Sequence, residues 1–235
     1  MPVLGSATTV AALSAPVALA AHAADVGMFV RFLAMCGPWT KPPASPDPAA
    51  FLGPVKPKSQ QEAFLATRVH RGVVGTRDVD LMRHMNNARY LREADFARHG
   101  LFVQCGLFHA AFYKAGTPMV TGAQTIRYRK ELKFRTRYEI RTRVLGWDPK
   151  GVTLEQLFVV PGKDGDQVHA VMLVREPMAG GKKDDAGPFT RVATLLGWDL
   201  PERQAGPPDV EAWIQSTADS SARVIAAAAA PTSKL

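Results

Sequence analysis

Hydrophobic residues recur at the spacing of an amphipathic helix just after Asn87, at Tyr90, Leu91, Ala94, Ala97 and Leu101. Residues three and four positions apart share one face of an α-helix, so this pattern predicts a helix with one buried side. Asn86 or Asn87 can cap its first turn, because a short side-chain carbonyl accepts a hydrogen bond from a free backbone N–H. Gly100 stands where we expect the helix to end.

Strand-like patterns lie on both sides of this helix. One precedes it, at residues 66–75, and four follow it, at residues 118–130, 135–147, 152–160 and 167–175. Within 135–147, Tyr138, Ile140 and Thr142 alternate with charged residues, as in a strand with one buried face. One strand, a long helix and four more strands predict an α+β fold. In this fold a five-stranded antiparallel sheet wraps one helix, so that each apolar face has a partner.

Changes in composition divide the chain into four parts. Residues 1–36 are rich in Ala and Val. Their apolar run is close to the roughly 20 residues that a membrane span needs, so it fits a membrane anchor, a re-entrant helix or a helix buried against a partner. Residues 37–60 contain seven prolines and predict a linker. Residues 61–178 carry the predicted sheet and helix, and residues 179–235 form an extension with one or two helices.

The formal charge of +8 over 235 residues favours anionic partners, such as a CoA phosphate, an acidic membrane face or nucleic acid. Basic residues gather between Arg127 and Arg143, where they fit either such a partner or the solvated face of two strands. Aromatic residues do not alternate with them as single-strand binding requires, so nucleic acid is disfavoured.

Cysteine use and motif content indicate a chain without disulfides, metal or cofactor. Cys36 and Cys105 are far apart, which favours a reducing compartment. The sequence shows no zinc-ligand spacing, no phosphate-binding glycine loop and no Gly-x-Ser-x-Gly elbow. We therefore expect neither a metal ion nor a cofactor.

The polar stretch from Asp78 to Leu91 reads D-x-D-x-x-x-H-M-N-N-A-x-Y-L and is followed by Asp95, Ala97 and Arg98. This motif resembles that of the hotdog-fold thioesterases of the 4-hydroxybenzoyl-CoA thioesterase type. The resemblance implies a single hotdog domain that acts on acyl thioesters. An animal branch of this superfamily is similar over more of the chain, and its resemblance implies that residues 1–36 are a membrane anchor.

Thioester hydrolysis needs a group that activates water and donors that hold the oxyanion. The resemblance assigns the first role to Asp80, the second aspartate of the motif, which could instead only tighten the turn. Backbone N–H groups from Asn87 onward suit the second role. Asn87 also falls where some relatives place a histidine near the thioester. His84 is a candidate base or a residue that packs within the loop.

Further candidates surround this centre. Glu93 is a fallback catalyst, because another hotdog branch uses a glutamate on the helix. Substrate binding is assigned to Asn86, Tyr90, Arg127, Arg129 and Lys130. Arg83 stands where active hydrolases of the family usually have a glycine, and a large side chain there would narrow the approach of the thioester or alter the turn.

Two main functions follow from these features. The first is a membrane-associated thioesterase, in which Asp80 activates water to hydrolyse an acyl-CoA or acyl-carrier thioester at a mitochondrial or endoplasmic reticulum membrane. The second is a catalytically silent hotdog subunit of a large mitochondrial or other membrane assembly. An acyl-binding sensor is a third. A single hotdog exposes a sheet edge, so we expect a homodimer or a larger complex.

Overall fold

The computed structural model describes residues 30–31, 43–54, 56–180 and 186–229. The chain forms two compact units, Met1–Trp39 and Thr40–Leu235. Nearly all of the expected N-terminal anchor, residues 1–36, lies outside the described residues, so the anchor stays a prediction. Within the described ranges, no helix has both the length and the apolar character that crossing a membrane requires.

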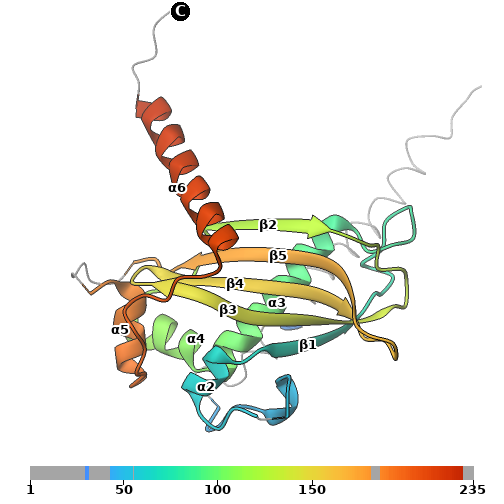
Figure 1. The fold of residues 1–235 in the computed structure, drawn as a ribbon, viewed down its shortest axis with the longest axis horizontal. Coiled ribbons are helices and arrows are strands. Elements are labelled where there is room, and N and C mark those ends of the chain that lie inside the picture. Colours follow the sequence, from blue (N-terminus) through green and yellow to red (C-terminus); the bar gives the residue numbers. More distant parts are fainter. Residues whose placement is uncertain (1–29, 32–42, 55, 181–185, 230–235) are drawn as a thin grey trace, which may run out of the picture. The chain divides into compact units, whose positions relative to one another are not determined.

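A five-stranded antiparallel sheet with the strand order β1-β3-β4-β5-β2 forms the larger unit's framework (Figure 1). The strands are β1 Arg68–Val73, β2 Ala123–Tyr128, β3 Arg137–Asp148, β4 Gly151–Val160 and β5 Gln167–Pro177. All five strands predicted from the sequence are confirmed. On β3, Tyr138, Ile140 and Thr142 are buried as their alternation predicted.

The long helix α3, Asn87–Gln104, crosses one face of this sheet (Figure 1). Asn86 is its N-cap, and the Asn86 side-chain oxygen accepts a hydrogen bond from the Ala88 N–H at 2.9 Å. The predicted end at Gly100 is wrong, because the helix continues to Gln104. Gly100 instead allows a close approach: a Cβ atom there would lie 2.5 Å from Nη1 of Arg68. That guanidinium donates to the carbonyl of Ala97.

The remaining helices of the described ranges are η1 Pro48–Ala50, α2 Gln60–Leu65, α4 Leu107–His109, the π-helix η2 Ala110–Ala115, α5 Pro188–Leu195 and α6 Pro208–Ala229. All but α6 are shorter than α3. The predicted linker also contributes to the core, because Phe51 is buried there and bridges to Arg68 of β1. Two hydrophobic clusters fill the interior, one around Phe64 and Trp147 and the other around Tyr90 and Phe158.

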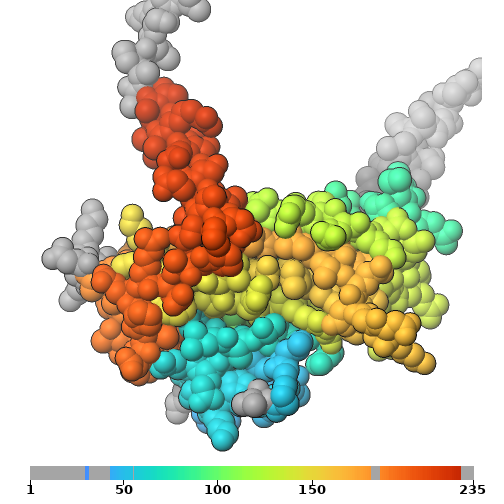
Figure 2. Space-filling model, in the orientation of Figure 1, coloured from blue at the N-terminus to red at the C-terminus, as the bar shows by residue number. Residues whose placement is uncertain are grey.

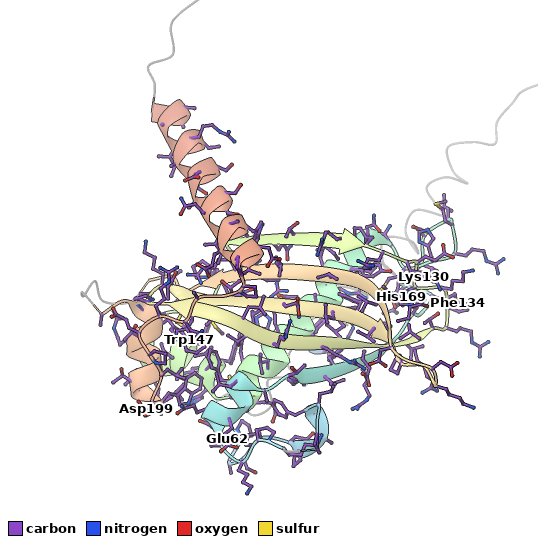
Figure 3. The ribbon with its side chains drawn as sticks, in the orientation of Figure 1. Glu62, Lys130, Phe134, Trp147, His169 and Asp199 are labelled. Atoms are coloured by element: carbon purple, nitrogen blue, oxygen red, sulfur yellow. The ribbon has the colours of Figure 1, made fainter. Side chains whose placement is uncertain are left out.

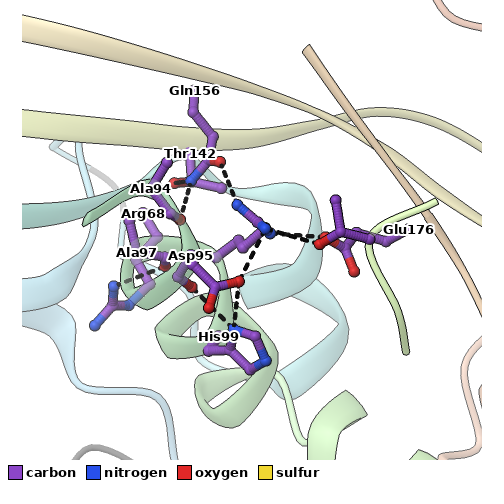
Figure 4. Close-up of polar contacts among 10 residues, drawn as sticks. Arg68, Ala94, Asp95, Ala97, His99, Thr142, Gln156 and Glu176 are labelled. Atoms are coloured by element: carbon purple, nitrogen blue, oxygen red, sulfur yellow. Dashed lines mark hydrogen bonds and ion pairs between the residues drawn. The ribbon is translucent and has the colours of Figure 1, made fainter. Parts of the chain in front are cut away.

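A buried guanidinium on α3 is held by polar side chains of the helix and the sheet (Figure 4). The Arg98 side chain is 3% exposed, and its Nε lies 2.7 Å from Oε1 of Glu176 on β5. Its Nη2 donates to Thr121 and pairs with Asp95, each at 2.8 Å. Gln156 of β4 accepts from Nη1 of Arg98 and donates to the carbonyl of Ala94. A buried charge is tolerated when its partners satisfy it in this way.

We predict that Glu176→Gln lowers the free energy of unfolding by about 3 kcal/mol, because it leaves the buried Arg98 charge without its main carboxylate. Urea denaturation followed by tryptophan fluorescence measures the loss. Glu155→Gln is the matched control on the neighbouring strand: it removes a pair with Arg143, whose side chain is 51% exposed. The control should lose less than about 1 kcal/mol. Equal losses would contradict a special role for the buried pair.

Candidate functional site

Asp78 ties the loop before α3 to the helix. One carboxylate oxygen accepts a hydrogen bond from the Gly75 N–H at 2.8 Å, and the other accepts from Arg92 at 2.7 Å. The Asp78 carbonyl accepts from the Asn86 N–H at 2.7 Å. Because these bonds engage both carboxylate oxygens and the carbonyl, the first aspartate of the motif holds the loop in place.

Asp80 occupies a tight turn that ends at His84. Its Oδ1 accepts a hydrogen bond from the Met82 N–H at 2.9 Å, and its carbonyl accepts from the Arg83 N–H at 3.0 Å. Its Oδ2 lies 3.6 Å from Nδ1 of His84. Asp80 therefore tightens the turn with one carboxylate oxygen and directs the other toward the imidazole.

Arg83 adopts the left-handed backbone conformation, with φ of 63°. Glycine enters this region freely, whereas other residues do so at a cost of about 1 kcal/mol. The turn thus has the shape that a glycine would give it. The Arg83 side chain is exposed and does not line the groove described next.

A groove of about 260 Å³ opens at the first turn of α3. The loop and helix line it with His84, Met85, Asn87 and Tyr90, and the end of β2 and the residues after it line it with residues 128–131. Five of the predicted site residues meet here, namely His84, Asn87, Tyr90, Arg129 and Lys130.

The other predicted site residues lie outside the groove lining. The Asn86 side chain caps α3, and Arg127 is an exposed residue of β2. Asp80 does not line the groove but has its Oδ2 3.6 Å from Nδ1 of His84, which does. Glu93, the fallback catalyst, is 4% exposed and pairs with Arg92 at 2.8 Å.

Two tyrosines connect the walls of the groove. The Tyr128 hydroxyl donates to the carbonyl of Asn87 at 3.1 Å, and the Tyr90 hydroxyl accepts from the Leu132 N–H at 3.2 Å. Their rings meet edge to face with centroids 5.2 Å apart. Burial raises the pKa of Tyr90 and that of Tyr128, so both hydroxyls stay protonated at neutral pH. The motif did not reveal Tyr128, which is distant in sequence.

The groove combines an aromatic interior with a basic rim. Arg129 and Lys130 are exposed, and Lys130 Nζ donates to Gln167 at 2.9 Å. A wider hollow of about 630 Å³ shares Arg129 with the groove and borders the β4–β5 turn. It contains none of the motif residues, so its size alone does not make it the better site.

Other kinds of centre find little support in the part of the chain that the structure describes. Burial raises the pKa of Cys105 to about 12, so this thiol is not a nucleophile at neutral pH. The described residues include no cluster of three or more His, Cys, Asp or Glu side chains that could hold a metal ion.

Comparison with known proteins agrees with this architecture. The profile of the thioesterase-like superfamily matches residues 74–214. The chain belongs to this superfamily and has its hotdog fold, as the motif and the wrapped helix predicted.

Within the superfamily, the chain is similar to proteins named THEM6. Protein THEM6 of Danio rerio is 41% identical over 157 residues, which cover 67% of this chain and 73% of that protein. Protein THEM6 of Xenopus laevis is 40% identical over 121 residues, 52% of this chain and 57% of that protein.

Solved structures of low sequence identity are also similar. One is a probable thioesterase from Bartonella henselae, with 18% identity, 50% of this chain and 96% of that chain covered, and a TM-score of 0.44. Another is a 4-hydroxybenzoyl-CoA thioesterase mutant complexed with 4-hydroxybenzoyl-CoA, with 14% identity, 50% and 87% covered, and a TM-score of 0.46.

We predict that Arg83→Gly is at least as stable as the unchanged protein, whereas Arg83→Val is about 1–2 kcal/mol less stable than the glycine variant. A β-branched residue fits the left-handed region poorly. Thermal and urea denaturation measure the difference. Met82, whose φ lies outside this region, is the control position. The same ordering of the glycine and valine variants at Met82 would show that the backbone conformation of Arg83 is not the cause.

Proposed function

We propose that this protein hydrolyses acyl-CoA or acyl-carrier thioesters in the groove at the start of α3. The observation that carries the proposal is the meeting of His84, Asn87 and Tyr90 with the basic rim formed by Arg129 and Lys130. An aromatic interior beside a cationic rim suits a ligand with an apolar acyl part and an anionic carrier. Membership of the thioesterase-like superfamily supports the same substrate class.

In this proposal, Asp80 is the base that takes a proton from the attacking water. Its Oδ2 lies 3.6 Å from Nδ1 of His84, a residue that lines the groove, and this places the carboxylate next to the water that His84 contacts. The water oxygen bonds to the carbonyl carbon, and the thiolate of the carrier then leaves. His84 orients the water.

The oxyanion lies at the first turn of α3. The N–H of Ala88 donates to the Asn86 side chain, and that of Arg89 donates to the Asn86 carbonyl. The N–H of Asn87 is the remaining donor of this turn, and the helix dipole adds to its effect. Asn87 therefore contributes its backbone to the reaction.

The second candidate function is a catalytically silent subunit of a mitochondrial or other membrane assembly. The engagement of Asp80 Oδ1 by the Met82 N–H favours it, because a carboxylate that holds a turn is less free to move toward a substrate. In both functions, residues 1–36 attach the protein to a mitochondrial or endoplasmic reticulum membrane.

A homodimer formed through β2 is part of the proposal. β2 pairs with β5 on one side only. Figure 2 shows its side chains along an uncovered rim of the larger unit, beside α6. Most of its residues are exposed, whereas those of β4 are largely buried. An open edge strand favours pairing with another strand, and a second copy supplies one around a twofold axis.

We predict that Asp80→Asn lowers kcat/KM for acyl-CoA by about 10²–10⁴, because the amide cannot accept the proton of water. A thiol-release assay over a panel of acyl chain lengths measures the change. Asp164→Asn in the exposed β4–β5 turn is the control and should keep full activity. Unchanged hydrolysis by Asp80→Asn would remove this carboxylate from the mechanism. A folded wild-type protein that hydrolyses no thioester would favour the silent subunit.

We predict that Thr125→Lys converts the dimer into a monomer. Thr125 lies in the middle of β2, so a twofold axis would bring two lysines together, and like charges opposite each other destabilise strand pairing. Light scattering after size-exclusion chromatography measures the mass. Arg71→Lys on β1, at the other end of the sheet, is the control and should keep the wild-type mass. An unchanged mass for Thr125→Lys would place the interface elsewhere.

A further inference from the structure

His169 lies on β5 outside every motif that the sequence offers. On β4, Phe158 pairs with Ala170 and Val159 pairs with Val168, so His169 is the extra residue of a β-bulge. Its side chain is 5% exposed. Figure 3 shows it at the same end of the sheet as Lys130 and Phe134. Bulges often redirect a side chain next to a functional site.

Three hydrogen bonds connect His169 to consecutive residues of the groove wall. Its carbonyl accepts from the Arg129 N–H at 2.8 Å and from the Lys130 N–H at 3.1 Å. Its ring Nδ1 lies 3.0 Å from the carbonyl oxygen of Glu131. A carbonyl oxygen only accepts hydrogen bonds, so Nδ1 carries the proton and donates.

These bonds fix one side of a wall whose other side is fixed by α3. There, Tyr128 donates to the carbonyl of Asn87, and Tyr90 accepts from the Leu132 N–H. Arg129 and Lys130, which form the basic rim, therefore lie in a segment that β5 holds through His169 and α3 holds through Tyr128 and Leu132. Without the His169 ring, the Glu131 carbonyl loses its partner, and the backbone that carries Arg129 and Lys130 is held less firmly.

We propose that His169 is a positioning residue for substrate binding. It touches no reacting atom, and it holds the basic rim where the anionic carrier of the thioester binds. His169 therefore sets the affinity for the carrier rather than the rate of the chemical step. This inference rests on the proposed thioesterase function for its substrate, while the hydrogen bonds to residues 129–131 can be tested without any substrate.

Two amide substitutions separate the roles of the ring nitrogens. In His169→Asn, the amide nitrogen takes the place of Nδ1 and can still donate to Glu131. In His169→Gln, the amide extends to the place of Nε2, and the bond to Glu131 is lost. The two variants have the same chemistry and differ by one methylene group, so they form a matched pair.

We predict that His169→Gln raises KM for acyl-CoA roughly fivefold with kcat within about twofold of wild type, which is the effect expected for losing one hydrogen bond. His169→Asn should restore a KM close to the wild-type value. Steady-state hydrolysis of one acyl-CoA over a range of concentrations measures both constants. A KM that rises equally in the two variants, or a loss confined to kcat, would overturn the positioning role.

Backbone hydrogen exchange distinguishes failure of this inference from failure of the proposed function. Mass spectrometry should detect faster exchange at residues 129–131 in His169→Gln than in His169→Asn, whether or not the protein hydrolyses thioesters. Equal exchange would overturn the inference. The ¹⁵N chemical shifts of the wild-type ring give a test that needs no variant to fold. An Nδ1–H tautomer supports the bond to Glu131, and an Nε2–H tautomer excludes it.

Discussion

The burial of the Arg98 guanidinium constrains how α3 lies on the sheet. A charge that is 3% exposed must keep its partners, and these come from α3 itself, β4, β5 and the segment before β2. Any rotation or sliding of the helix would separate Arg98 from Glu176 or Gln156 and leave its buried charge unpaired, at a large cost in free energy. Hydrophobic packing alone would resist such a shift less, because it does not depend on specific pairs of atoms. The two hydrophobic clusters supply most of the attraction between helix and sheet, and the guanidinium selects one arrangement among those they would accept.

Two separately held segments form the groove. Its first wall is the start of α3, which Asn86 caps and Asp78 ties to the preceding loop. Its second wall is the segment after β2, which the β5 bulge holds through His169. The hydrogen bonds of Tyr90 and Tyr128, and that from the Met85 N–H to the carbonyl of Leu132, connect the two walls directly. The width of the groove therefore depends on the sheet, the helix and the bulge together, so substitutions far from the motif can change it.

Local patterns in the sequence predicted the strands, the long helix and its cap, because periodicity and capping depend on neighbouring residues. The family resemblance added the hotdog fold and directed attention to His84, Asn87 and Tyr90. Neither the local patterns nor the family resemblance predicted contacts between residues that are distant in sequence. Gly100 was predicted to end the helix, whereas the structure shows that it leaves room for the side chain of Arg68, 32 positions earlier. His169 offered no signal, because its importance arises from a bulge register and from carbonyls on another segment.

The left-handed turn at Arg83 bears on how activity is judged from sequence across this superfamily. A turn of this kind requires a positive φ at one residue. Glycine adopts that φ with the least strain, but its lack of a side chain is not needed for the chemistry. Arginine and glycine codons differ by a single base, so one mutation can exchange them while the loop keeps its path. An arginine where the motif led us to expect a glycine is thus a poor sign of lost activity, and the torsion angle is the better criterion.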